Sequence, residues 1–382
     1  MKSSEIVALV DQAIGDGRVE GVSVHVQHHG ETVFEHAAGS AFGTAVRSSS
    51  AWWVASITKP VVAAGVLACV EDGTLRVDDP VDRYIPSFAR RRLVRRLPSG
   101  GALATDASPL GDEPSEWVYD VAERPISVRH LLTMTSGLQT IGVPNAAIRP
   151  PQAHESLAQY VDSLADAPLD FQPGERWHYS NAVGFEVLAR LIEVASGSSL
   201  TDFLRDRIFD PIGADTIDFT MTGRAADTVL PAPPFLGNNP IIDSFTSGSA
   251  GLFAPAADLA RFVSMLVAGG AGRDGRVLSE HSVAQMTSNQ IGDLRLAGVD
   301  AREYGGLPHR TNPGVGYGYG LLTVLDPASA GVPVGTGSFG WDGIGTRRIW
   351  GLPDQGLALV VLIEGSDADD LHRAIERAVV NG

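Results

Sequence analysis

The sequence contains one cysteine, Cys69, and therefore cannot form an intramolecular disulfide. Cys69 lies in an apolar run with helical spacing, residues 66–70, and is expected to pack in the core. No apolar run approaches the ~20 residues that cross a membrane as a helix. The first residues also lack the basic start and apolar stretch of a signal peptide. These absences predict a cytoplasmic protein that has no membrane partner and no disulfide scaffold.

Positive charge is scarce as well. The chain has 29 Lys and Arg against 45 Asp and Glu, a formal net charge of -16, whereas binding to nucleic acid depends on concentrated basic residues. The glycine-rich segment 248–253 lacks the strand and lysine of a phosphate-binding loop. The histidines between residues 21 and 36 are expected to face solvent on an alternating strand, not to bind a metal. We therefore expect no nucleic-acid partner, no metal and no cofactor.

Strand and helix patterns are segregated along the chain. Strand patterns occupy both ends, at residues 21–27, 32–36, 318–325, 338–350 and 357–363. Helical periodicity predicts helices at residues 5–16, 58–72, 127–138, 156–167, 182–196, 200–208, 256–268 and 369–380. This order predicts an α+β fold, in which an antiparallel β-sheet is flanked by terminal helices and a mainly helical region is inserted. We assign residues 1–75 and 245–382 to the sheet region, residues 76–244 to the helical region, and the active site to their interface.

A basic cluster, Arg90–Arg92 with Arg95 and Arg96, precedes a segment rich in Gly, Ser, Pro and Asp at residues 98–115. The composition is typical of a solvated loop. Long loops in compact domains are often functional, so a lid or an anion-attracting rim over the active site, formed by residues 89–123, stays open as the alternative.

The segment around Ser56 carries the first sign of chemistry. Ser56 and Lys59 are three residues apart, so a helix that begins near Ser56 places both side chains on one face. A serine hydroxyl needs an adjacent base to act as a nucleophile at neutral pH. A lysine can be that base if burial lowers its pKa, and apolar residues surround Lys59 in the sequence.

Two later segments supply partners for this pair. Tyr179 and Asn181 stand on a turn just ahead of a helix, from which both polar groups can point into one cleft. Trp341, Asp342 and Gly343 precede strand-like residues, and a glycine there lets a substrate approach the backbone closely. Purely structural roles stay open: Tyr179 as a helix-entry aromatic, Asn181 as an N-cap, Trp341 as core packing.

Ser-x-x-Lys, Tyr-x-Asn and a late glycine-bearing triad, in this order, resemble the serine β-lactamase and penicillin-binding-protein superfamily, and within it the class C and family VIII esterase branch. Similar segments elsewhere support the likeness, at residues 127–138, 209–213, 249–253 and 258–262. The resemblance implies that Ser56 is the nucleophile and that Lys59 accepts or relays its proton. It implies that Tyr179 acts with the lysine as general base and then as acid to the leaving group. It also implies that Asn181 bonds the lysine and substrate, and that the backbone N–H groups of Ser56 and Ile344 form the oxyanion hole.

The third motif departs from the β-lactamases, which carry Lys-Thr-Gly where this chain has Trp341-Asp342-Gly343. A tryptophan cannot attract the carboxylate of a penicillin, and Trp-x-Gly is similar to family VIII esterases. We therefore expect a serine hydrolase without cofactor or metal that acts on small or medium acyl esters. The alternatives are an amide or peptide hydrolase (a D-amino-acid amidase, a peptidase or a weak β-lactamase), an acyltransferase, or a non-catalytic ligand receptor. The sequence does not set the oligomeric state.

Overall fold

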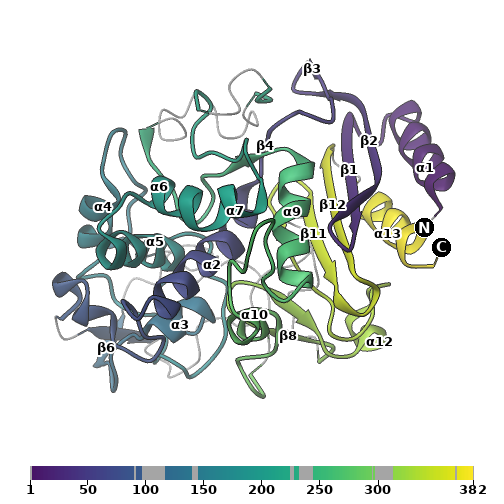
Figure 1. Cartoon of the computed structure of the whole chain (residues 1–382). Helices are drawn as coiled ribbons and strands as arrows, with labels where there is room; N and C mark the ends of the chain where they lie inside the picture. The colour runs from purple at the N-terminus through teal and green to yellow at the C-terminus, as the bar shows by residue number, and fades with distance from the viewer. Residues whose placement is uncertain are drawn as a thin grey trace.

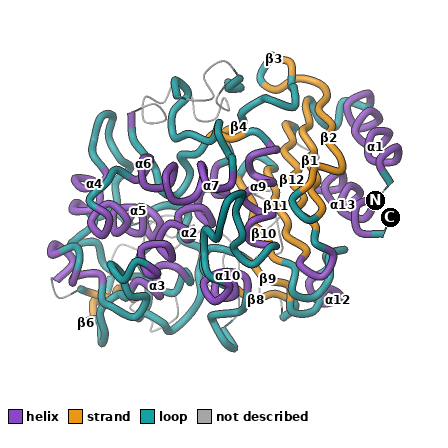
Figure 2. Tube along the Cα trace, in the orientation of Figure 1, coloured by secondary structure: helices purple, strands orange, loops and turns teal. Residues whose placement is uncertain are grey.

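The computed structural model describes residues 2–89, 92–96, 117–139, 145–223, 228–231, 244–294, 296, 313–365 and 368–381. The predicted loop at 98–115, and with it most of the lid predicted at 89–123, lies outside the described residues. Figure 1 shows a sheet on one side of the molecule and a group of helices on the other. The tube in Figure 2 makes the same division visible as orange strands beside purple helices, with α2 in between.

The sheet is antiparallel and has eight strands, in the order β3-β2-β1-β12-β11-β10-β9-β8. Their bounds, in that order, are Thr44–Ala45, Glu31–Ala41, Gly21–His28, Leu357–Glu364, Arg347–Leu352, Phe339–Gly343, Leu322–Val324 and Val315–Tyr317. The first three strands come from the start of the chain and the other five from its end. The predicted antiparallel sheet built from both ends is therefore present.

Helices cover both faces of this sheet. The terminal helices α1 (Ser3–Gly15) and α13 (Ala368–Val380) pack side by side on one face, and α9 (Ala256–Val267) packs on the other (Figure 1). Strand β12 is a continuous apolar run, Leu-Ala-Leu-Val-Val-Leu-Ile, because both of its faces are covered. The fold is the α+β arrangement predicted from the sequence.

Strand β1 is more buried than its alternating sequence predicts. Ser23, His25 and Gln27, expected to face solvent, are only 2–4% exposed. The Gln27 side-chain oxygen accepts from the Ser264 hydroxyl of α9 at 2.7 Å, so α9 covers this polar face. His25 bonds the Thr32 hydroxyl at 3.0 Å, and burial lowers its pKa. The prediction that this histidine faces solvent is therefore wrong.

The other helices are α2 Thr58–Glu71, α3 Val128–Leu132, α4 Leu157–Ser163, α5 Val183–Ser196, α6 Leu200–Leu204, α7 Asp210–Ile212, α10 Glu280–Thr287 and α12 Pro327–Ala330. Short 3-10 turns stand at Ala55–Ile57, Val81–Arg83, Pro86–Ala89 and Pro353–Gln355, and a π turn at Arg205–Phe209. Two small sheets pair β4 (Trp52–Trp53) with β7 (Phe253–Ala254) and β5 (Leu93–Arg96) with β6 (Val118–Val121). Helix α2 is buried along nearly its whole length and packs on α5.

Two predicted elements have different limits in the structure. The helix predicted at 127–138 ends at Leu132, because Met134 adopts a left-handed backbone with φ of 55°. The strand predicted at 318–325 is interrupted by a turn between β8 and β9, where Gly320 has φ of 77°. In the part of the chain that the structure describes, no helix is long and apolar enough to cross a membrane.

Candidate active site

The turn that carries Ser56 is held from both sides. The chain leaves strand β4 and reaches α2 through a 3-10 turn, in which Ala55 adopts φ of 49°. A non-glycine residue in this region stores strain and persists only where its surroundings hold it. The Thr58 hydroxyl donates to the Ala55 carbonyl at 2.7 Å and accepts from the Leu252 N–H at 3.1 Å. Ser56 is thus fixed in the turn just before α2, and its side chain remains partly exposed.

The Lys59 side chain lies one turn below Ser56 and is fully buried. Its Nζ donates to Ser56 Oγ at 2.9 Å, to the Asn181 carbonyl at 2.8 Å and to the Ser249 carbonyl at 2.9 Å. All three partners are neutral. Burial lowers the pKa of Lys59 from 10.5 to about 7, and the more distant Glu186 carboxylate opposes that shift. A substantial share of Lys59 is therefore neutral near pH 7 and able to accept a proton.

Tyr179 approaches Ser56 from the other side. The Tyr179 hydroxyl and Ser56 Oγ lie 2.8 Å apart. Lys59 Nζ contacts the same Ser56 oxygen and lies 5.4 Å from the centroid of the Tyr179 ring. Burial is the main cause that raises the pKa of Tyr179 to about 12, and the Asp342 carboxylate adds to it. The phenol is therefore protonated at neutral pH and available as a proton donor.

Asn181 contributes through its backbone. Its carbonyl accepts from Lys59, while the residue as a whole is exposed. The N-cap of α5 is Ala182, without a side-chain cap bond, so the alternative that Asn181 caps this helix is wrong. Gln139 Oε1 instead accepts from the N–H groups of Ala182 and Val183, at 3.3 and 3.2 Å.

The third motif lies on β10. The Trp341 ring is buried, 5.7 Å from the Tyr179 ring and 5.3 Å from the Tyr317 ring between centroids. A Cβ on Gly343 would lie 2.3 Å from the Val54 carbonyl oxygen, so glycine lets the end of β10 press against the Ser56 turn. Ile344 follows at the tip of the β10–β11 hairpin and is 39% exposed.

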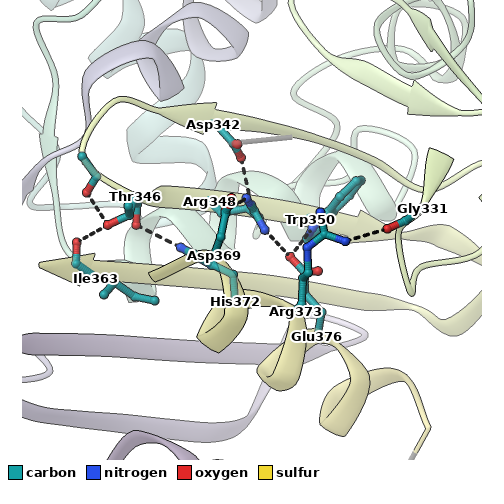
Figure 3. Close-up of polar contacts among 11 residues, drawn as sticks. Gly331, Asp342, Thr346, Arg348, Trp350, Ile363, Asp369, His372, Arg373 and Glu376 are labelled. Atoms are coloured by element: carbon teal, nitrogen blue, oxygen red, sulfur yellow. Dashed lines mark hydrogen bonds and ion pairs between the residues drawn. The ribbon is translucent and has the colours of Figure 1, made fainter. Parts of the chain in front are cut away.

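Asp342 lies on the opposite face of the sheet. Its carboxylate accepts from Arg348 at 3.1 Å, and Arg348 also contacts Glu376 and Asp369 of α13 (Figure 3). The alternation of side chains along a strand accounts for this direction of Asp342, opposite to that of Trp341. Two consecutive residues of β10 therefore point to opposite faces of the sheet. Trp341 lies beside Tyr179, which contacts Ser56, and Asp342 lies in a buried ionic cluster with Arg348.

Two residues beside the site were missed by sequence reasoning. Ser249 offers the carbonyl that binds Lys59, and Glu186 of α5 accepts hydrogen bonds from the segment that contains Ser249. The sequence held a signal for Glu186, a carboxylate between apolar residues on an amphipathic helix. Within the described ranges, no group of three or more His, Cys, Asp and Glu side chains is placed to hold a metal ion.

Comparison with known proteins identifies the family. The family model described as Beta-lactamase matches residues 6–381 of this chain. The chain is 29% identical over 390 residues to esterase EstB of Burkholderia gladioli, which covers 94% of this chain and 89% of EstB. The solved structure of EstCE1, a hydrolase with promiscuous acyltransferase activity, superposes with a TM-score of 0.73 at 21% identity, over 99% of this chain and 98% of that one.

A solved family VIII carboxylesterase has a TM-score of 0.74 at 17% identity, over 99% of this chain and 97% of that one. These likenesses confirm the β-lactamase/transpeptidase-like fold and the family resemblance drawn from the sequence motifs. The chain belongs to the Beta-lactamase family and is a serine hydrolase.

Proposed function

We propose that this protein is a serine carboxylesterase that hydrolyses small or medium acyl esters through an acyl-enzyme on Ser56. One observation carries the proposal. The carbonyls of Asn181 and Ser249 take two directions around Lys59 Nζ, and Ser56 Oγ takes a third. When Lys59 is neutral, its two N–H bonds satisfy the two carbonyls and its lone pair points at the Ser56 hydroxyl. That is the arrangement required of a general base.

In acylation, Lys59 takes the proton of Ser56 as Oγ attacks the ester carbonyl. The backbone N–H groups of Ser56 and Ile344 stabilise the oxyanion, a role favoured by the contact of Gly343 with the Ser56 turn. Tyr179 gives its proton to the departing alkoxide, which leaves as the alcohol. The products of this step are an ester on Ser56, a Lys59 ammonium and a Tyr179 phenolate.

Deacylation restores both groups. The Tyr179 phenolate takes a proton from the attacking water, and the Lys59 ammonium returns a proton to Ser56 Oγ as it leaves. The sum consumes one ester and one water and releases one alcohol and one acid. Asn181 and Trp341 are assigned to substrate binding in this proposal, Asn181 through its exposed side chain and Trp341 as a wall beside Tyr179.

The substrate class follows from charge. Trp341 stands where the β-lactamase motif has a lysine, so no ammonium at that position attracts a carboxylate. Neutral acyl esters are therefore favoured over penicillins, and the esterase names of EstB and of the family VIII structure agree with this choice. The division into a sheet region and a helical region, and the cytoplasmic location, stay predictions.

Replacement of the nucleophile tests the proposal. Ser56→Ala should lower the rate of p-nitrophenyl ester hydrolysis by more than about a thousandfold, because the acyl-enzyme cannot form. Its melting temperature should stay near that of the wild type. Ser288→Ala, at an exposed serine, is the matched control and should keep full activity. Most of the activity surviving in Ser56→Ala would contradict the mechanism.

A substrate panel separates the alternatives. Esters, amino-acid amides and nitrocefin are assayed side by side, with and without an added alcohol as acyl acceptor. The proposal expects the highest kcat/KM for neutral esters. Faster turnover of amides than of esters would identify an amidase. Acyl transfer to the added alcohol that is faster than hydrolysis would identify an acyltransferase. If a covalent acylating probe leaves no adduct on the folded protein in intact-mass spectra, the proposed acyl-enzyme on Ser56 is contradicted.

A further inference from the structure

The residue beneath the site that the mechanism leaves unused is Glu186. Its side chain is 2% exposed, yet it is a carboxylate in the interior of the protein. Glu186 Oε1 accepts from the hydroxyls of Ser247 and Ser249, at 2.5 and 2.7 Å, and from the Ser249 N–H at 3.3 Å. Oε2 accepts from the Gly248 N–H at 2.7 Å. Four donors converge on one carboxylate, and this pattern favours its ionised form.

The same segment, residues 247–249, also binds Lys59 through one of its members, Ser249. Ser249 gives its N–H and hydroxyl to Glu186 and its carbonyl to Lys59 Nζ, at 2.9 Å. Gly248 makes the approach possible, since a Cβ there would lie 2.4 Å from the Ala189 Cβ and 2.6 Å from the Phe185 carbonyl. The 247–249 segment is thus clamped onto α5 by Glu186, and the direction of the Ser249 carbonyl follows from that clamp.

Glu186 also supplies negative charge without touching the lysine. Ser249 separates the two groups, so Lys59 remains hydrogen-bonded to neutral partners. Burial raises the pKa of Glu186, while its hydrogen bonds and Lys59 oppose the rise. A buried carboxylate that does not contact the amine stabilises the ammonium form of Lys59 by charge. The direction of the lone pair of the neutral amine is set by the carbonyls that Lys59 contacts.

We propose that Glu186 is a positioning residue for the general base. It fixes the Ser249 carbonyl that orients Lys59, and its charge sets the pH above which Lys59 accepts the proton of Ser56. The inference rests on the proposed function, in which Lys59 is the base. The groups that face Lys59 are Ser56, the ring of Tyr179, the ring of Phe185 at 5.8 Å, and Glu186.

The groups that face Glu186 are the hydroxyls of Ser247 and Ser249, Lys59, and the phenol of Tyr160 on α4. Glu186 contributes to a raised pKa of Tyr160, after burial, so this phenol stays neutral at working pH. Among the described residues that act on Lys59, Glu186 is thus the carboxylate whose charge a variant can remove.

The first variant removes the charge and keeps the shape. In Glu186→Gln, the acid limb of the kcat/KM profile for a neutral p-nitrophenyl ester should move to lower pH by roughly one unit, because a lysine without a nearby carboxylate loses its proton more easily. Glu193→Gln, the same change on the outer face of α5 where Glu193 pairs with Arg190, should leave the limb in place. A folded Glu186→Gln variant whose acid limb does not move would overturn the proposal.

Two further variants, Ser247→Ala and Glu186→Asp, separate the positioning effect of Glu186 from the effect of its charge. Ser247→Ala loosens the clamp and keeps the carboxylate, so kcat should fall several-fold while the acid limb stays. Glu186→Asp keeps the charge but has a shorter side chain, so kcat should again fall several-fold while the acid limb stays in place. This variant tests the inference even if Glu186→Gln does not fold. Wild-type kcat in both folded variants, or a moved limb in Glu186→Asp, would refute the positioning role.

A readout independent of turnover keeps this test apart from the test of the esterase. The pH dependence of Ser56 labelling by an acylating probe, followed by intact mass, reports the base directly. If the wild type hydrolyses no ester but is labelled, the esterase proposal fails and the shift in Glu186→Gln still decides the inference. If labelling in the wild type shows no acid limb, Lys59 is not the base and the inference about Glu186 fails with it.

Discussion

Lys59 and Arg348 are buried cations on opposite sides of the sheet, and their immediate surroundings differ. Lys59 is fully buried among a hydroxyl and two carbonyls, and its pKa falls to about 7. Arg348 is 5% exposed and contacts three carboxylates at 3.0–3.1 Å, those of Asp342, Glu376 and Asp369 (Figure 3). Burial lowers the pKa of Arg348 too, but the carboxylates more than compensate and the pKa is raised.

The comparison teaches that burial alone does not decide the state of a charge. A carboxylate in contact keeps the cation charged, whereas neutral acceptors orient it and leave it able to lose its proton. The Arg348 cluster therefore serves as framework, joining α13 to β10 and β11 through side chains that also include Trp350, whose indole N–H donates to Glu376 at 2.9 Å. The neutral contacts of Lys59 leave it able to lose and accept a proton, as the proposed function requires. Strand β10 connects the two, since Trp341 faces one and Asp342 the other.

Removing Lys59, the proposed general base, should give the largest change in rate. Lys59→Met should lower kcat/KM for a neutral ester by about 10²–10⁴-fold, the range for loss of a general base. Its stability should not fall by more than about 1 kcal/mol at pH 7, since the variant no longer buries a cation without a contacting carboxylate. Ester kinetics measure the change in kcat/KM, and urea unfolding measures the change in stability. A variant that keeps its rate, or that is severely destabilised, would break the comparison.

The same variant isolates a pH effect on stability. The pKa of Lys59 is about 7 in the folded protein, whereas the ordinary value for a lysine, 10.5, applies to the unfolded chain. Between pH 7 and pH 10.5, Lys59 is therefore protonated in the unfolded chain and neutral in the folded protein. The free energy of unfolding of the wild type, relative to Lys59→Met, should therefore rise with pH by up to about 1.4 kcal/mol per unit across this window. It should be level below pH 7, where both states are protonated. A flat difference would show that Lys59 is not desolvated.

Removing Arg348, the cation that joins α13 to the sheet, should instead lower the stability of the protein. Arg348→Met removes the guanidinium that contacts the carboxylates of Asp342 and Glu376, which are 8% and 1% exposed as residues. The free energy of unfolding should fall by about 3–5 kcal/mol, the cost of breaking a buried ion pair from one side. Arg373→Met, on the exposed face of α13, is the control and should stay within about 0.5 kcal/mol of the wild type. Equal urea midpoints for the two variants would contradict the assignment.

The smallest effect concerns selectivity. Trp341→Lys places an ammonium where the β-lactamase motif has one and should raise the ratio of carboxylate-bearing to neutral substrates about tenfold, equivalent to about 1.4 kcal/mol. Trp341→Met, which also loses the contact with the Tyr179 ring, controls for lost packing and should leave the ratio unchanged. An unchanged ratio in Trp341→Lys would show that β10 does not govern substrate charge.

Much of the fold followed from patterns that are local in the sequence. The apolar run of β12, the helical periodicity of α5 and α13, and the strands at both ends predicted the sheet and its covering helices. The β5–β6 pair was missed, because short strands with mixed polarity carry little periodic signal. The burial of Ser23 and His25 was missed because α9, which comes from a distant part of the chain, covers them.

In the candidate active site, too, some features follow from local sequence and others only from tertiary packing. The three-residue spacing of Ser56 and Lys59 places their side chains within hydrogen-bond distance by local geometry, and the motifs identified Tyr179 as their partner. The sequence could not reveal that the carbonyls of Asn181 and Ser249 orient the amine, because every residue has a carbonyl and only the folded chain gives it a direction. Local spacing thus determined which groups could react. The tertiary structure decided the proton affinity of Lys59, since desolvation and distant charge arise only when remote segments pack together.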